Sequence, residues 1–187
     1  GRNTAALVAQ DVASGATKVI AEDARADIGG TLTDPVTGEV EAYSVEYLRD
    51  EWIALDTDIG KSLAFLKSKL KGDFYVQSRT DKDDRWIVSN DPVTEPGKVW
   101  LYDRTKGTLT EFYNPRPDLV GAPLPAMYAR EIKSRDGLTL VSYLTLPYGS
   151  DPDADGVPNK PVPMVLMVHG GPWGRDSYGS NRYHQLL

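Results

Sequence analysis

The stretch Val162-Pro-Met-Val-Leu-Met-Val-His-Gly-Gly-Pro172 joins an apolar run to two consecutive glycines. A nearly continuous apolar run of this length is typical of a strand buried on both faces, as in a parallel sheet that helices cover. Glycines lack a Cβ atom, so the backbone that follows such a strand can expose its N–H groups in an open cleft. We therefore expect a buried strand at 162–168 that ends in an open loop at 169–172.

This loop has a chemical interpretation. His-Gly-Gly after a buried strand is the arrangement with which esterases and peptidases of the α/β-hydrolase type build part of their oxyanion hole. One main-chain donor of this kind is worth about 10²–10³ in rate. The alternative is that Gly170-Gly171-Pro172 is only a turn that leaves a strand. The apolar run before the motif favours the hydrolase interpretation.

Short β-type runs separated by turn residues fill the first part of the chain. Lys98–Tyr113 reads as two strands joined by a turn at Asp103 to Gly107, and Ala6–Ala21 repeats this unit with a turn at Asp11 to Gly15. The two Asp-x-x-x-Gly turns lie 92 residues apart, and Asp56 with Gly60 falls between them at spacings of 45 and 47. A period in the forties with two or more strands per unit predicts β-propeller blades.

The middle match has a second interpretation. Apolar residues at 63, 66 and 70 predict an amphipathic helix directly after Gly60, with Lys67, Lys69 and Lys71 on its solvated side. Either that blade carries a helical insertion or the match is chance. We expect the aromatic rings of the short strands, Trp52, Trp86 and Trp100, to belong to the core rather than to a binding surface.

The composition changes near residue 125. Residues 114–130 carry four prolines and predict a linker. A hairpin that turns at Asp136-Gly137 is expected over 130–147, followed by a loop at 148–161. The predicted fold is therefore mixed: antiparallel β as partial β-propeller blades at 1–124, then the first strands of an α/β-hydrolase domain at 125–187.

These residues resemble a known family. Ser134-Arg-Asp-Gly-Leu-Thr-Leu-Val-Ser-Tyr-Leu-Thr-Leu-Pro147 and Val165-Leu-Met-Val-His-Gly-Gly-Pro172 are similar to the opening of the hydrolase domain in the prolyl oligopeptidase family. The branch in question contains acylaminoacyl peptidases and bacterial dipeptidyl peptidases. In that family a β-propeller precedes the hydrolase domain, and residues 83–88 and 98–104 look like its final blades. The motif is most specific at 165–172 and least specific before residue 80.

The resemblance implies roles for the loop residues. It makes Gly171 the main-chain donor to the oxyanion, with Gly170 and His169 shaping the loop around it. Trp173 and Arg175 lie where such enzymes place residues that border the substrate cleft. No cofactor is implied.

The serine nucleophile of the family sits in a Gly-x-Ser-x-Gly elbow, with Asp and His partners later in the chain. No such elbow occurs here. Ser180 lacks the flanking glycines and follows no predicted strand, and His184 reads as a surface residue on a helix start. We therefore expect neither nucleophile nor triad partners in these residues. We also expect Gly1 to lie inside a blade and Leu187 inside the first hydrolase helix, as in a piece of a longer protein that is inactive alone.

Asp151-Pro-Asp-Ala-Asp-Gly156 imitates the opening of a calcium loop. A full loop needs a bidentate Glu at the twelfth position, which here is Val162. We interpret the segment as a solvated surface loop and expect no metal site; weak calcium binding is the alternative, which a calcium titration tests.

Bulk properties exclude several classes of partner. The net charge of −6 argues against nucleic acid as a partner. No apolar run approaches the roughly 20 residues of a membrane-spanning helix. There are no cysteines, so disulfides and thiolate metal sites are excluded. We expect a soluble protein for which the cytoplasm or periplasm of a bacterium both fit; the compartment and homo-oligomer formation stay open.

The function predicted from the sequence is therefore a part of a serine peptidase that hydrolyses short peptides by acyl transfer. Its partners would be the peptide substrate and the remainder of the parent polypeptide. One alternative is a non-catalytic β-propeller-type interaction module, which would have no reason to carry His169-Gly-Gly-Pro172. Another is a fragment of a different α/β hydrolase such as an esterase, which would lack the blades.

Overall fold

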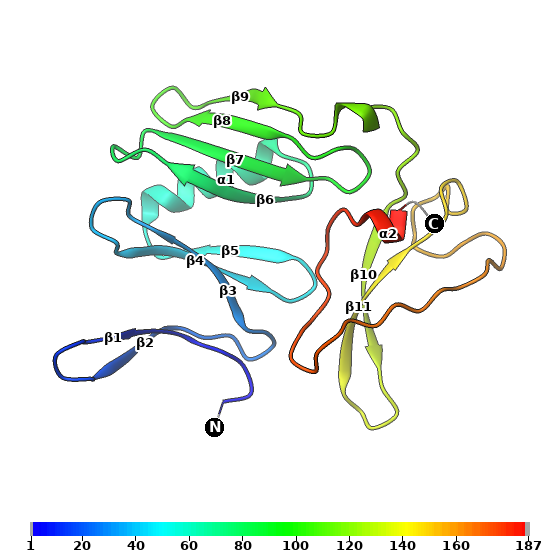
Figure 1. The fold of residues 1–187 in the computed structure, drawn as a ribbon, viewed down its shortest axis with the longest axis horizontal. Coiled ribbons are helices and arrows are strands. Elements are labelled where there is room, and N and C mark those ends of the chain that lie inside the picture. Colours follow the sequence, from blue (N-terminus) through cyan, green and yellow to red (C-terminus); the bar gives the residue numbers. More distant parts are fainter. Residues whose placement is uncertain (1, 186–187) are drawn as a thin grey trace.

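The regular structure is mostly antiparallel β-sheet. A computed structural model describes residues 2–185, in which the strands form four open sheets arranged without closure into a barrel (Figure 1). This agrees with the expected partial propeller blades. Gly1 and Leu187, for which positions inside a blade and inside a helix were expected, lie outside the described residues.

The N-terminal sheets are small. A hairpin comes first, followed by a three-stranded meander in the order β3-β4-β5. Their bounds are β1 Leu7–Gln10, β2 Thr17–Ala21, β3 Ile28–Thr33, β4 Val40–Glu46 and β5 Asp50–Ala54. The first hairpin matches the unit expected at 6–21.

The next sheet is a four-stranded meander in the order β6-β7-β8-β9, which is the strand number and order of one propeller blade. Its strands are β6 Asp73–Arg79, β7 Arg85–Asp91, β8 Val99–Asp103 and β9 Thr108–Tyr113. The predicted hairpin is formed by β8 and β9, and Gly107 in its turn has φ +63°. A residue with a Cβ atom would be strained there, which is why glycine closes this turn.

Helix α1 (Thr57–Lys69) begins directly after Asp56, the residue that opens the third Asp-x-x-x-Gly match. The Asp56 carboxylate caps it by accepting hydrogen bonds from the N–H groups of Asp58 at 2.8 Å and Ile59 at 2.9 Å. Gly60 lies within the helix rather than in a hairpin turn. The predicted helix is therefore confirmed, with Asp56 as its N-cap, and the helix fits both alternatives for the midway match, a blade with a helical insertion or chance.

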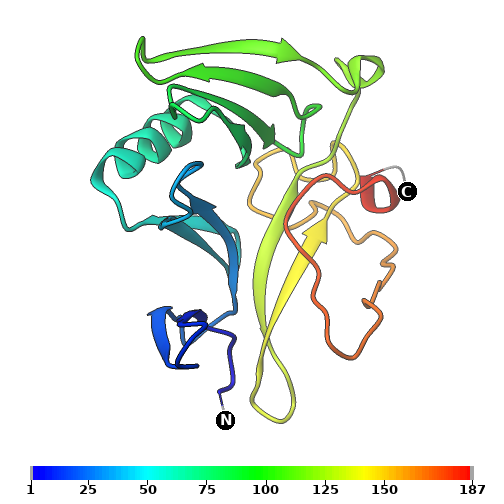
Figure 2. The same cartoon turned by 60° about the vertical axis from the view of Figure 1, so that its left-hand side comes forward.

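The core lies between α1 and the two larger sheets (Figures 1 and 2). Trp86 and Leu66 are fully buried in it, and Trp52 and Trp100 pack against it at its edge, so the expectation that these tryptophans are core is confirmed. The three lysines 67, 69 and 71 are exposed, as the amphipathic pattern predicts. The remaining members of the buried cluster are Leu32, Ala42, Ile59, Leu63, Leu70, Phe74, Val88 and Tyr102.

The proline-rich segment after β9 contains one short 3-10 helix, η1 (Pro117–Leu119), and then enters β10 (Met127–Lys133). β10 pairs along its length with β11 (Thr139–Thr145) in the hairpin expected around Asp136-Gly137, and Gly137 has φ +88°. Both views show this hairpin running beside the stacked sheets (Figures 1 and 2).

The apolar run at 162–168 does not form the expected buried strand. The described backbone over 161–169 has no strand or helix, and Met164, Leu166 and Val168 expose 83%, 78% and 75% of their surface. A strand needs a neighbour to accept and donate its main-chain hydrogen bonds, and no described strand pairs with this segment. The short helix α2 (Arg182–Gln185) follows, near the helix start expected at His184.

No helix within residues 2–185 has the length and apolar character needed to cross a membrane.

Candidate functional site

The His169–Gly174 turn carries the candidate oxyanion donor and lies on the surface. Gly174 N–H donates to the Pro172 carbonyl oxygen at 3.1 Å, and His169 Nδ1 lies 2.9 Å from the Gly170 carbonyl oxygen. Within residues 2–185 no protein acceptor occupies the Gly171 N–H. An exposed main-chain donor without a partner is what an oxyanion site requires.

The two glycines differ in the room around them. A Cβ atom on Gly171 would lie 2.8 Å from the Trp173 backbone nitrogen, closer than real side chains approach, whereas a Cβ atom on Gly170 would meet nothing within 4 Å. Gly171 is therefore required by the backbone packing of the turn. The structure therefore gives a steric reason for a glycine at position 171, and this reason is independent of catalysis.

Trp173 and Arg175 leave the turn in different surroundings. Trp173 exposes 95% of its surface. The Arg175 guanidinium instead reaches the end of β4, where Nη2 donates to the Tyr47 carbonyl oxygen at 2.6 Å and Nη1 donates to that of Glu46. Whether either residue borders a substrate cleft stays a prediction; Arg175 binds the blades in this structure.

Ser180 and His184 do not form a nucleophile–base pair among the described contacts. The Ser180 hydroxyl donates to an Asp91 carboxylate oxygen at 2.6 Å, and its N–H donates to the other oxygen at 2.6 Å. His184 is half-buried in α2. A serine activated for attack needs a base within hydrogen-bond reach. The group that the Ser180 hydroxyl reaches is the Asp91 carboxylate, not a histidine. The absence of the triad from these residues stays a prediction.

Sequence reasoning missed the partners on the blades. Tyr47 and Arg49 lie in the connection between β4 and β5, and Asp91 ends β7; all three are far from the glycine turn in sequence, and no local pattern marks them. Contacts between residues 89 to 129 positions apart leave no periodicity to detect. Only the folded chain brings these residues to the segment after His169.

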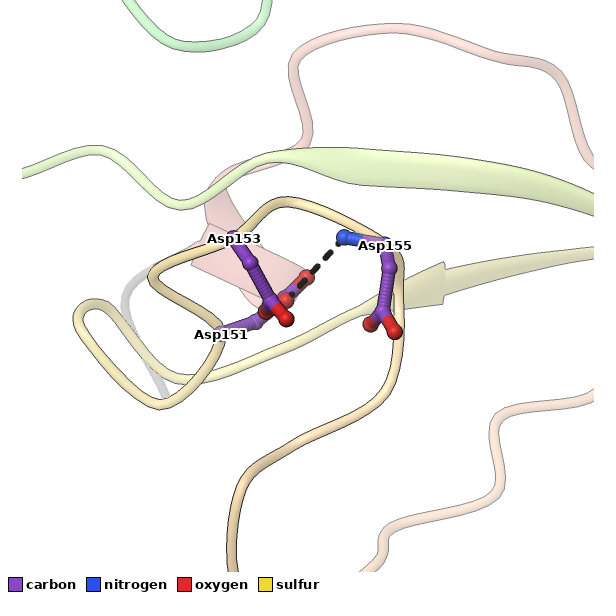
Figure 3. Close-up of side chains that lie close together, drawn as sticks. All are labelled: Asp151, Asp153 and Asp155. Carbon is purple, nitrogen blue, oxygen red and sulfur yellow. Dashed lines mark hydrogen bonds between the residues drawn. The ribbon is translucent and has the colours of Figure 1, made fainter.

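The acidic loop brings its three carboxylates together, each contributing an oxygen within 4.8 Å of the others (Figure 3). Asp151 is already occupied, because it accepts the Tyr128 hydroxyl at 2.6 Å and the N–H groups of Gly156 at 2.9 Å and Asp155 at 3.2 Å. These hydrogen bonds lower the pKa of Asp151, and the bond from the Tyr128 hydroxyl has the largest effect. The same hydrogen bond raises the pKa of Tyr128 to about 12. The carboxylate thus organises its own loop, and metal binding stays a separate question for experiment.

A pocket of about 250 Å³ opens where α1 meets β5 and β6. Asp50 lines this pocket, and its burial raises its pKa to about 6. A hydrogen bond with Ser44 lowers the pKa, while the nearby Glu46 and Asp73 carboxylates raise it further. None of the residues that line this pocket in the described structure is a serine or a histidine, so the pocket holds no serine–histidine pair. Its walls are formed by Asp50, Glu51, Trp52, Ala54, Gly60, Leu63, Ala64, Lys67, Gly72, Asp73 and Phe74.

Comparison with known proteins gives two informative relatives. The chain is 54% identical, over all of its 187 residues, to dipeptidyl aminopeptidase BIII of Pseudoxanthomonas mexicana and covers 27% of that protein. Over 170 residues, 83% of the chain, it is 28% identical to dipeptidyl peptidase family member 6 of Caenorhabditis elegans, of which it covers 23%. The chain thus spans about a quarter of the length of the curated relatives it matches. No family model matches the chain.

An alignment at 54% identity over all 187 residues is far beyond chance similarity, and it spans the positions of both quoted motifs. The relatives are named as dipeptidyl peptidases, in line with the branch of the prolyl oligopeptidase family that residues 134–147 and 165–172 resemble. The resemblance inferred from the sequence is therefore confirmed: the chain is, from end to end, homologous to a segment of a dipeptidyl aminopeptidase.

Proposed function

We propose that these residues are one part of a serine peptidase that removes dipeptides from short peptide substrates. The observation that carries this proposal is the full-length similarity to dipeptidyl aminopeptidase BIII. The exposed His169-Gly170-Gly171 turn supports it, because the open Gly171 N–H is suited to an oxyanion. The domain division near residue 125 is part of the proposal.

The proposed chemistry is acyl transfer. A serine Oγ outside these residues attacks the scissile carbonyl while a histidine, oriented by an aspartate, takes the serine proton. The carbonyl oxygen becomes an alkoxide, and the Gly171 N–H donates a hydrogen bond to it. The intermediate then expels the amine, which takes the proton from the histidine, and water hydrolyses the acyl-enzyme by the same steps. In this scheme the blades restrict access to short peptides.

The test uses the full-length protein that contains these residues. A dipeptide anilide reports amide hydrolysis, and a fluorophosphonate labels the activated serine, whose position is mapped by peptide mass spectrometry. We expect amide turnover that is lost in step with labelling of one serine outside residues 1–187. Turnover by residues 1–187 alone, or a label on Ser180, would contradict the proposal.

The same assay separates the alternatives. An esterase would hydrolyse the matched dipeptide ester but leave the anilide intact. A non-catalytic interaction module would neither hydrolyse nor become labelled. Hydrolysis of both substrates with a single labelled serine is the result expected of a peptidase.

A further inference from the structure

The segment after the glycine turn is held on the blades by its side chains. The Arg175 guanidinium donates to the Tyr47 carbonyl oxygen at 2.6 Å, to the Tyr143 hydroxyl at 3.0 Å and to the Glu46 carbonyl oxygen. Tyr47 belongs to the connection between β4 and β5, and Tyr143 belongs to β11. Because a guanidinium is planar and its donors have fixed directions, these bonds set the orientation of Arg175 as well as its position.

Tyr178 forms a second attachment. Its half-buried ring lies under the Arg49 guanidinium, 3.7 Å from the ring centroid, and meets the Tyr143 ring edge to face at 6.2 Å. Arg49 cannot swing away freely, because Nε and Nη2 bind the carboxylate of the buried Asp73 at 3.0 and 2.6 Å. The tyrosine therefore rests on a cation that the blade sheet already fixes.

The third attachment continues in the same direction along the chain. Asp91, at the end of β7, accepts both the N–H and the hydroxyl of Ser180 at 2.6 Å, and Gln185 Nε2 donates to the Val93 carbonyl oxygen at 3.0 Å. Successive contacts at 175, 178, 180 and 185 thus follow the blades from β4 to β7.

The distance along the chain from these contacts to the candidate donor is short. Gly171 precedes Arg175 by four residues, a span of at most about 14 Å even when fully extended. On the other side of the turn, the described residues 163–168 are exposed and make no strand pairing. Among the described residues, the position of the turn on the molecule is therefore set from its C-terminal side.

We propose that Arg175 and Tyr178 are positioning residues for the Gly171 N–H: by binding Tyr47 and Arg49 they hold the His169–Gly174 turn in one place on the blades. The inference rests on the proposed function, in which the Gly171 N–H binds the oxyanion. Neither side chain touches the substrate in this role. The blades then help to place the donor in addition to restricting access.

The physical consequence is specific to the transition state. A hydrogen bond to an oxyanion is strong only when the donor meets the alkoxide oxygen, and misplacement by about 1 Å can cost about 10²-fold in rate. Substrate binding that does not involve the oxyanion is little affected by such a shift. Loss of either contact should therefore lower kcat and leave KM nearly unchanged.

The test compares variants of the full-length protein in dipeptide anilide hydrolysis. Tyr178→Ala and Arg175→Met are expected to lower kcat about 10- to 100-fold with little change in KM. Tyr178→Phe keeps the ring under Arg49 and should retain nearly full kcat. The exposed Tyr148 and Arg135 provide matched controls, and Tyr148→Ala and Arg135→Met should behave as the unaltered protein.

Hydrogen exchange gives a readout that does not depend on activity. The hydrogen-bonded amides of Gly174 and Ser180 should exchange faster in Tyr178→Ala than in Tyr148→Ala, while exchange in β6–β9 stays unchanged, which separates a local effect from unfolding. An active protein whose Tyr178→Ala variant keeps its kcat, or in which these two amides exchange no faster, overturns the positioning role alone. If the unaltered protein neither hydrolyses the anilide nor binds fluorophosphonate, the proposed function fails first.

Discussion

Arg79 Nη1 lies 2.7 Å from a Glu41 carboxylate oxygen and so joins β6 of the four-stranded sheet to β4 of the neighbouring sheet. The same guanidinium donates to the Thr33 carbonyl oxygen at 2.8 Å and lies over the Trp86 ring. The Arg79 side chain is only 6% exposed and Glu41 18%. Because a buried charge is tolerated only when it is paired, this contact ties the relative placement of the two sheets to the core.

Replacing this arginine should therefore be costly. Arg79→Met leaves the Glu41 and Asp83 carboxylates without their shared cation, and we expect a loss of about 3 kcal/mol in the free energy of unfolding. Urea denaturation followed by tryptophan fluorescence measures it. As a control, Lys61→Met removes an ion pair with Asp58 that is fully in solvent and should leave the midpoint almost unchanged. Equal effects of the two variants would contradict the view of Arg79 as a buried link.

The cap of α1 gives a smaller, local effect. Asp56→Ala removes the acceptor for the Asp58 and Ile59 N–H groups and should cost about 1 kcal/mol in the free energy of unfolding. Asp56→Asn keeps an acceptor oxygen at the same place and should recover most of the loss. The same urea titration compares the two variants, and a similar loss in both would mean that the charge rather than the cap matters.

Asp50 should make stability depend on pH. Its folded pKa of about 6 lies above the usual unfolded value near 4, so the folded protein binds more protons than the unfolded chain between these values. Stability should therefore fall as pH rises from about 4 to 6. Asp50→Asn should remove that part of the decline, seen as a smaller difference in Tm between pH 4 and pH 7. The exposed Glu39→Gln serves as the control and should keep the decline of the unaltered protein.

The glycine turn allows two neighbouring substitutions to be compared in the full-length protein. Gly171→Ala forces its Cβ atom against the Trp173 nitrogen and should displace the donor, which we expect to lower kcat about 10²-fold. Gly170→Ala meets no atom within 4 Å and should lower kcat less. Dipeptide anilide kinetics measure both. A greater loss for Gly170→Ala would argue against Gly171 as the donor.

Calcium should have little effect on the acidic loop. Asp151 is already bound to Tyr128 and to two backbone N–H groups, and Val162 stands where a calcium loop has its bidentate Glu. We expect no rise in Tm at about 10 mM calcium, roughly ten times the dissociation constant of the weakest extracellular sites. A rise that is lost in Asp153→Asn would show that the three carboxylates bind the ion.

The hairpins and the helix could be predicted because their causes are local. Gly107 and Gly137 occupy positive φ at the turns where the pattern placed them, and a side chain there would be strained whatever the rest of the fold. The spacing of Asp56 to Gly60 was ambiguous, since the same residue type starts a helix or a turn, and here Asp56 caps a helix. Short-range sterics and capping thus determined the elements, with this one ambiguity between two local uses of aspartate.

The sequence by itself determined the blades, the hairpin at 127–145 and the presence of a His-Gly-Gly turn, through glycine conformation, apolar periodicity and capping. Only the tertiary structure decided where that turn stands. Arg175 meets Tyr47, and Ser180 meets Asp91, across 128 and 89 residues, and such contacts follow from how sheets pack rather than from any local pattern. The apolar run at 162–168 shows the same limit, because strand propensity becomes a strand only where another backbone completes its hydrogen bonds.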